Sequence, residues 1–225
     1  MIEEKRAGFI AVIGSPNAGK STLINHFIGQ KVTIVTRKVQ TTRSVIRGIC
    51  IHKESQLVFS DTPGIFEPKR RLDRAMVEAA WGSSSDADII LFLYDAQKSG
   101  IDNETNKILD ELGQSRKKKI LVLNKVDLVD KKTLLPLIKN FESICSFDAT
   151  FIVSALTGEG SKEVLSYLAK NLPKGPWLYP EDEITDLPAR LLAAEITREQ
   201  IFMRLHQELP YATTVETEEW TERDD

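Results

Sequence analysis

The feature that most constrains this chain is a glycine-containing segment at residues 14–21, which reads Gly-Ser-Pro-Asn-Ala-Gly-Lys-Ser. It directly follows the apolar run at residues 8–13 and directly precedes a helix-like stretch at residues 22–28. A loop of this kind between a strand and a helix is a P-loop, in which backbone N–H groups and the helix N-terminus surround the phosphates of a nucleotide. A chance glycine turn is the alternative, and the strand-loop-helix context argues against it. The segment therefore predicts an α/β fold that binds a nucleotide.

Every position of this loop is expected to lie against the nucleotide. Lys20 is predicted to reach the β- and γ-phosphates and to act in catalysis, and the Ser21 hydroxyl is predicted to be a Mg²⁺ ligand. The nucleotide-binding residues expected here are Gly14, Ser15, Pro16, Asn17, Ala18, Gly19, Lys20, Ser21 and Thr22.

Composition favours a cytoplasmic globular protein. The 225 residues are 41% hydrophobic and 28% charged, which is ordinary for one sizeable α/β domain with residues left for a second element. No apolar run approaches the roughly 18 residues of a membrane span, and residues 1–6 do not resemble a signal peptide. Cys50 and Cys145 are far apart in apolar surroundings, so we expect two buried thiols in a reducing compartment rather than a disulfide or a metal pair.

The net charge of −3 carries no global signal for nucleic acid, but the charges are unevenly distributed. Residues 216–225 are strongly acidic, and three clusters are basic. A solvated surface is the alternative for each basic cluster, and the better interpretation for the third, because a strand follows it immediately. The basic clusters are Arg37, Lys38, Arg43 and Arg47, then Lys69–Arg71, then Arg116–Lys119.

Strand and helix patterns alternate over residues 1–172, which predicts one doubly wound domain with a mostly parallel sheet covered on both faces. Two short strands joined by a polar turn suggest a hairpin near its start. Strands are expected at residues 8–13, 44–52, 56–60, 88–94, 119–124 and 150–153, and helices at 22–28, 72–82, 103–112, 134–143 and 162–172.

The character changes at Pro173. Residues 173–188 are rich in proline and acidic side chains and are predicted to be a linker. In residues 189–225 we expect a helix over 189–209 and a strand over 213–217. So few residues bury little core, so this segment either packs on the first domain or begins an incomplete second one.

Three further motifs follow predicted strands. Asp61-Thr-Pro-Gly64 supplies a carboxylate that can hold Mg²⁺ through water and a glycine N–H, at Gly64, that can meet the γ-phosphate during catalysis. In Asn124-Lys125-Val-Asp127, the Asp127 carboxylate can accept two hydrogen bonds from guanine that adenine cannot offer. Ser154-Ala155-Leu156 completes a predicted guanine site, with the Ala155 N–H as a candidate partner for guanine O6. Alone, each later motif could be a helix cap or a turn.

A polar loop around Gln40-Thr41-Thr42-Arg43 is expected to be the switch that senses the third phosphate. Thr42 is the predicted Mg²⁺ ligand, together with Ser21 and Asp61, and Thr41 is the neighbouring alternative. A surface threonine is the structural alternative for Thr42. In this order, the motifs are those of a GTPase that binds GTP, GDP and Mg²⁺.

Two residues bear on the mechanism. Ras-type enzymes have a glutamine after the Asp-x-x-Gly motif to orient the attacking water, whereas this chain has Ile65, so intrinsic hydrolysis should be slow. Asn17 resembles the asparagine of GTPases that hold K⁺ beside the phosphates, and our hypothesis is that K⁺ supports hydrolysis better than Na⁺.

The chain resembles the Era-like family of bacterial ribosome-assembly GTPases over nearly its whole length. Besides the GTPase motifs, the more specific stretches are residues 180–186, 194–199 and Glu-Leu-Pro-Tyr at 208–211. The resemblance implies an N-terminal GTPase domain and a C-terminal KH domain that binds the 3′ end of 16S rRNA in the small ribosomal subunit. It also implies peripheral association with the inner face of the membrane, and we expect a monomer.

KH domains clamp RNA with a Gly-x-x-Gly loop, and no glycine follows residue 189. We therefore expect residues 189–225 to be an incomplete KH-like α+β segment, with the family's rRNA binding impaired. Two other functions remain open from the sequence: a non-catalytic GTP-binding module, because of Ile65, and a related GTPase of RNA modification.

Overall fold

The computed structural model describes residues 4–36, 38, 41–205 and 209–221, and within them six strands form one sheet of order β2-β3-β1-β4-β5-β6. All neighbouring strands are parallel except β2 and β3. The predicted doubly wound, mostly parallel sheet is confirmed. The strands are β1 (Arg6–Ile13), β2 (Ile46–His52), β3 (Ser55–Asp61), β4 (Ile89–Asp95), β5 (Lys118–Asn124) and β6 (Ala149–Ile152).

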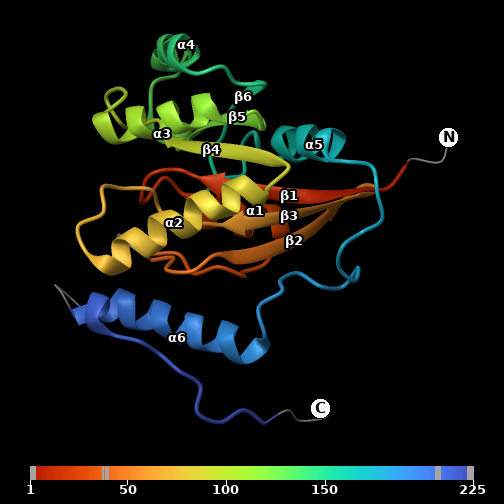
Figure 1. Cartoon of the computed structure of the whole chain (residues 1–225), viewed down its shortest axis with the longest axis vertical. Helices are drawn as coiled ribbons and strands as arrows, with labels where there is room; N and C mark the ends of the chain where they lie inside the picture. Colours follow the sequence, from red (N-terminus) through yellow and green to blue (C-terminus); the bar gives the residue numbers. More distant parts are fainter. Residues whose placement is uncertain (1–3, 37, 39–40, 206–208, 222–225) are drawn as a thin grey trace.

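Helices cover both faces of the sheet (Figure 1), which divides the core into two layers. One layer lies beneath α1 and α5, and the other beneath α2, α3 and α4. Because both faces of β4 and β5 are buried, these central strands are almost continuously apolar rather than alternating. The helices are α1 (Lys20–Ile28), α2 (Arg71–Asp86), α3 (Asn103–Gln114), α4 (Leu134–Ile144), α5 (Ser161–Asn171) and α6 (Ala189–Arg204).

The expected hairpin is confirmed: β2 and β3 pair antiparallel from Ile46 opposite Asp61 to His52 opposite Ser55. Lys53 turns the chain between them with a left-handed φ of 55°. The hairpin carries the chain to the edge of the sheet and back beside β1, so that β3 ends at the same sheet edge as β1.

The segment that follows α5 lies along the hairpin and is fastened by one buried side chain. The Gln56 side chain has no exposed surface, accepts hydrogen bonds from the N–H groups of Leu178 and Tyr179, and donates to the Tyr179 carbonyl. Further along, the Ile49 N–H donates to the Ile184 carbonyl. Residues 173–188 are therefore a fixed strap over β2 and β3.

The C-terminal part departs from expectation in two places. The helix expected over residues 189–209 ends at Arg204, because Leu205 is extended with φ −83° and ψ 149°. Residues 213–217 form no strand, since none of the described residues pairs with them. Alternating side chains alone had suggested that strand. Arg37, Gln40, Glu208 and residues 222–225, singled out in the sequence, lie outside the described residues.

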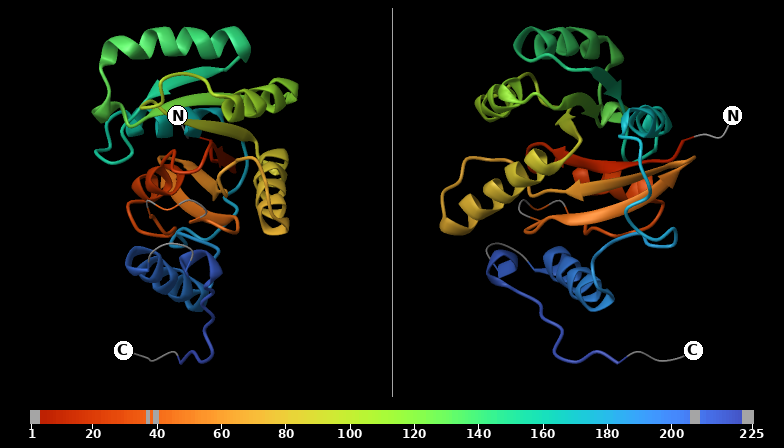
Figure 2. Two further views of the ribbon diagram at one scale, coloured as in Figure 1. Left: turned by 90° about the vertical axis from the view of Figure 1, so that its left-hand side faces the viewer. Right: turned by 45° about the vertical axis from the view of Figure 1, so that its right-hand side comes forward.

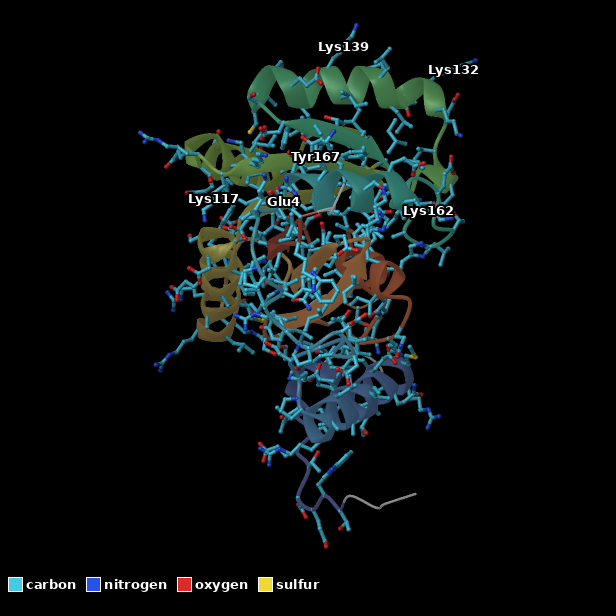
Figure 3. The ribbon with its side chains drawn as sticks, turned by 90° about the vertical axis from the view of Figure 1, so that its right-hand side faces the viewer. Glu4, Lys117, Lys132, Lys139, Lys162 and Tyr167 are labelled. Atoms are coloured by element: carbon cyan, nitrogen blue, oxygen red, sulfur yellow. The ribbon has the colours of Figure 1, made fainter. Side chains whose placement is uncertain are left out.

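Two surface expectations also need correction. The basic run at residues 116–119 is not merely solvated: Lys117 Nζ donates to the carbonyls of Ser85 and Ala87 and ties the end of α2 to the start of β5 (Figure 3). Both cysteines are free thiols, as expected, but only Cys145 is fully buried, while Cys50 is half-buried.

None of the helices in the described part of the chain has the length and apolarity to cross a bilayer.

Because Gln56 fastens residues 178 and 179 to β3, its removal should lower the stability of the folded chain. Gln56→Ala deletes three hydrogen bonds and leaves two backbone N–H groups to partly accessible water, so we expect the free energy of unfolding to fall by about 1–2 kcal/mol in urea denaturation. Gln200→Ala, on the exposed side of α6, is the matched control and should change it by less than about 0.5 kcal/mol. Equal effects of the two substitutions would show that the strap does not depend on Gln56.

Candidate functional site

The predicted site residues come together because parallel strands end at one edge of the sheet. β1 runs into the loop at residues 14–19, β3 ends at Asp61, β5 ends at Asn124, and the loop containing Ser154 follows β6. The views in Figure 2 show these loops gathered around the N-terminal end of α1. In doubly wound sheets this edge is where ligands bind.

The loop at residues 14–19 presents an open helix N-terminus. α1 begins after Gly19, which has a left-handed φ of 99°, and no side chain caps the first turn. A Cβ on Gly19 would lie 2.3 Å from Asn124 Nδ2, so only glycine fits there. The uncapped N–H groups and the positive end of the helix dipole make this a ready site for phosphate.

Lys20 is buried in the loop, with 6% of its surface exposed. Its Nζ donates to the Gly14 carbonyl at 3.2 Å and the Ser15 carbonyl at 3.1 Å, but no carboxylate forms an ion pair with it in the described residues. Burial lowers the pKa of Lys20 to about 8, opposed by the nearby Asp61 carboxylate. This buried cation is poised for an anionic ligand.

Three oxygen-bearing side chains converge beside Lys20. The Ser21 hydroxyl donates to Asp61 Oδ2 at 2.7 Å, and the Thr42 hydroxyl lies 3.3 Å from both Asp61 Oδ2 and Ser21 Oγ. Asp61 is fully buried, and its Oδ1 has no hydrogen-bond partner among the described residues. Burial raises the pKa of Asp61 to about 6, against the hydrogen bond from Ser21 and the charge of Lys20.

This donor set fits the predicted magnesium ion. Hydroxyl and carboxylate oxygens are the ligands that Mg²⁺ prefers, and the unpartnered Asp61 Oδ1 leaves one oxygen for a cation or its water. A nucleotide phosphate and a divalent cation would together compensate the two buried charges, Lys20 and Asp61, that the protein itself leaves incompletely paired.

Burial separates the two neighbouring threonines. Thr42 is 7% exposed and faces Ser21 and Asp61, whereas the Thr41 hydroxyl bonds to Thr36 Oγ1 and the Lys38 carbonyl. The geometry favours Thr42 over Thr41 as the metal ligand and does not support a free surface threonine.

The Asp61–Gly64 segment is seated directly on the phosphate loop. The Ile65 N–H donates to the Gly14 carbonyl, and a Cβ on Gly64 would lie 2.7 Å from the Pro16 nitrogen. The Ile65 side chain is buried in the core beneath α2 and α3. Gly64 therefore lies beside the predicted γ-phosphate position, and Ile65 supplies no polar group there.

Asn124 joins three loops of the predicted base site. Its Nδ2 donates to the Ala18 carbonyl and its Oδ1 accepts from the Ala155 N–H at 2.9 Å. The Ala155 N–H, expected to meet guanine O6, thus also holds the loop together. Lys125 adopts a left-handed φ of 65° and pairs with Asp95.

The remaining base-site residues frame the opening of the site. Asp127 is exposed in a short 3-10 helix, η1 (Val126–Leu128), and Leu156 is 79% exposed, while Ser154 is fully buried. The Ser154 hydroxyl accepts from the Thr157 N–H and shapes the turn that presents Leu156.

Sequence reasoning missed two supports of the site. Asn25 Oδ1 accepts from the N–H groups of Val32 and Thr33 and so fastens the chain leaving α1. Arg198 and Glu199, from α6, contact the segment that carries Thr42. The only signal was a pair of charged residues within an otherwise apolar helical stripe.

Comparison with known proteins agrees with this geometry. The family model described as 50S ribosome-binding GTPase matches residues 9–125. GTPase Era of Sinorhizobium medicae is 58% identical over 220 residues, which are 98% of this chain and 71% of that protein. The chain belongs to the Era family of GTPases.

Two crystal structures of Era proteins have the same fold. An Era bound to MgGDPNP and nucleotides 1506–1542 of 16S ribosomal RNA matches with a TM-score of 0.87 and 41% identity, over 92% of this chain and 70% of that one. An Era variant from Aquifex aeolicus bound to GDP·AlF4⁻ matches with a TM-score of 0.86 and 42% identity, over 91% and 70%.

The two glycines that flank α1 offer a matched test of the site. Gly19 and Gly29 both have left-handed φ, but a Cβ on Gly29 has nothing within 4 Å. Gly29→Ala should cost about 1 kcal/mol of unfolding free energy and leave nucleotide affinity within about twofold. Gly19→Ala should lower guanine nucleotide affinity by at least about tenfold in fluorescence titration, because its Cβ strikes Asn124. Equal affinities of the two variants would contradict this account of the loop.

Proposed function

We propose that this chain binds GTP at the edge of the sheet and hydrolyses it to GDP and phosphate, as a nucleotide-dependent switch. The observation that carries the proposal is the convergence of Ser21, Thr42 and Asp61 beside the buried Lys20. Three elements distant in sequence supply these groups. Gain or loss of the third phosphate therefore changes the contacts of all three elements.

The residues have distinct roles in this proposal. Residues 14–19 and the first turn of α1 surround the phosphates with N–H groups, and Lys20 moves from the Gly14 and Ser15 carbonyls to the β- and γ-phosphates. Gly64 offers its N–H to the γ-phosphate. When bound, Mg²⁺ would neutralise charge on the phosphates and orient them, and Ser21, Thr42 and Asp61 are the residues that would hold it.

The sequence departs from Ras-type enzymes at Ile65, so the chain itself supplies no glutamine to orient water. Asn17 is exposed in the loop, with a left-handed φ of 59°, and is the residue that we assign to a K⁺ ion beside the phosphates. We propose that K⁺ contributes the positive charge that an arginine supplies in other GTPases.

Guanine selection is assigned to Asn124, Lys125, Asp127 and the loop at residues 154–156. Asn124 fixes the two loops relative to each other, and Asp127 reads the N1–H and exocyclic amine of guanine. The short 3-10 helix η1 holds Asp127 at the opening of the site.

The biological process we propose is assembly of the small ribosomal subunit in the cytoplasm, with 16S rRNA as the partner. The support is the 58% identity with GTPase Era and the likeness to an Era bound to 16S rRNA. We also propose that residues 189–225 belong to a KH-like segment, which is the part that the family resemblance places after the GTPase domain. Association with the inner face of the membrane, which the resemblance also implies, is not needed for this role.

The competing function is a GTP-binding module without catalysis, and Ile65 is the observation that favours it. Substitutions of the neighbouring residues Thr42 and Thr41 distinguish the catalytic function from the binding module. Thr42→Ala removes a predicted metal ligand and should lower the single-turnover rate of GTP hydrolysis by about a hundredfold.

Thr41→Ala is the control, because the Thr41 hydroxyl faces Thr36 and Lys38, and its rate should stay within about threefold of the wild type. No hydrolysis by the wild-type chain above the buffer rate, in K⁺ and Mg²⁺, would establish the binding module instead. A larger loss in Thr41→Ala would reassign the metal ligand.

The base site has its own test. Asp127→Asn exchanges an acceptor for a donor and should invert the preference from GTP to xanthosine triphosphate in competition binding, by at least about a hundredfold. Asp130→Asn, three residues further on, keeps its backbone cap on Lys132 and should leave the preference unchanged. Retained GTP preference in Asp127→Asn would remove Asp127 from the base site.

A further inference from the structure

The face of α6 that packs on the GTPase domain buries charged side chains. Arg198 is 4% exposed, Glu199 is 1% exposed, and Phe202, one turn later, is fully buried. In Figure 1, α6 lies alongside the hairpin edge of the sheet, away from the guanine-binding loops. Burying a charge is costly unless the charge is paired and hydrogen-bonded. The partners of Arg198 and Glu199 therefore indicate what these two buried charges do.

Both partners of Glu199 lie in the connection between α1 and β2. We call its described residues 31–36, 38 and 41–43 the switch segment. Glu199 Oε1 accepts from the Val35 N–H at 2.8 Å, and Oε2 pairs with Lys31 Nζ. One carboxylate thus bridges two points, four residues apart, at the start of the switch segment. The charge-assisted bonds are of the stronger kind found in proteins.

Arg198 and its neighbours hold the other end of the switch segment. Arg198 Nη2 donates to the Thr41 carbonyl at 2.8 Å, while Glu195 accepts from the same guanidinium. Arg43 donates to the carbonyls of Pro210 and Thr213. Lys38 Nζ donates to the carbonyls of Phe202 and Leu205.

Thr42 therefore stands between two anchored residues. The Thr41 carbonyl is held by Arg198, and the guanidinium groups of Arg43 and Arg198 both lie over the Phe202 ring, at 5.5 and 5.2 Å from its centre. With its neighbours fixed outward on α6, the Thr42 hydroxyl is directed inward to Ser21 and Asp61.

We propose that Arg198 and Glu199 are positioning residues for the reaction, which hold the switch segment on α6 so that Thr42 reaches the metal and γ-phosphate site. This inference rests on the proposed function. Fixing the backbone of each residue costs conformational entropy, so a segment of this length needs anchors to present one hydroxyl reliably. Arg198 and Glu199 on α6 supply such anchors.

Arg198→Met tests this directly, because it keeps the side-chain volume and removes the donors. The expected result is a loss of about tenfold in the single-turnover rate of GTP hydrolysis, since small displacements of positioned groups have effects of this order. GDP affinity should stay within about twofold, because the hydrogen bonds of Arg198 go to Glu195 and Thr41, outside the phosphate loop. Arg198→Lys, which retains one donor for the Thr41 carbonyl, should recover part of the rate.

Arg190→Met is the matched control, since Arg190 lies exposed on α6 and its rate should equal that of the wild type. A double-mutant cycle decides whether Arg198 acts through Thr42. In the Thr42→Ala background, Arg198→Met should change the rate by less than about twofold. A further tenfold loss in that background would overturn the proposal, because Arg198 would then act independently of Thr42.

Two other outcomes would also overturn it: an unchanged rate in Arg198→Met, or a parallel fall of GDP affinity and hydrolysis, which would mean that α6 only stabilises the fold. Hydrogen exchange distinguishes loss of the anchor from general unfolding, if a variant folds poorly. In Glu199→Met, which removes both acceptor oxygens and keeps the length of the side chain, the Val35 N–H should exchange at least about tenfold faster while the β1 N–H groups stay protected, and equal exchange would contradict the anchoring. A wild-type chain that binds GTP without hydrolysing it would instead defeat the proposed function, with the anchoring still visible in exchange.

Discussion

The site depends on two buried charges of opposite sign, Lys20 and Asp61, because their chemistry determines which ligand can bind. Lys20 is the first residue of α1 and Asp61 is the last residue of β3, and the hydrogen bonds to each of them come from neutral groups. Burial shifts both pKa values toward the neutral forms, because the two charges are removed from water. A site with an unsatisfied cation beside an unsatisfied carboxylate is complementary to a phosphate group carrying a divalent metal ion.

The topology of the sheet brings these side chains together without long loops. Adjacent parallel strands end at one edge, so the loops after β1, β3, β5 and β6 converge without any long excursion of the chain. Glycine permits the closest approaches, as at Gly19 against Asn124, where a side chain would collide. Asn124 then links the loop at Ala18 to the loop at Ala155 and makes the phosphate and base sites parts of one body.

Local chemistry made much of this predictable from the sequence. The P-loop, the hairpin and the central strands follow from short-range pattern, and the structure reproduces their ends to within two residues. The choice between Thr41 and Thr42 did not follow, because the two residues are chemically identical and only their burial separates them. The strand expected at residues 213–217 was wrong because alternation does not supply a partner strand. The contacts of Arg198 with Thr41 and of Glu199 with Val35 span 157 and 164 residues, and no local pattern encodes such distances.

The central claim is that Ser21, Thr42 and Asp61 form the metal site of a GTPase. It is tested most directly by a crystal structure of this chain with Mg²⁺ and a non-hydrolysable GTP analogue. The account predicts Ser21 Oγ and Thr42 Oγ1 at about 2.0–2.1 Å from the ion, with Asp61 behind a coordinated water. A metal ion bound without Thr42, or with the Thr41 hydroxyl in its place, would contradict it.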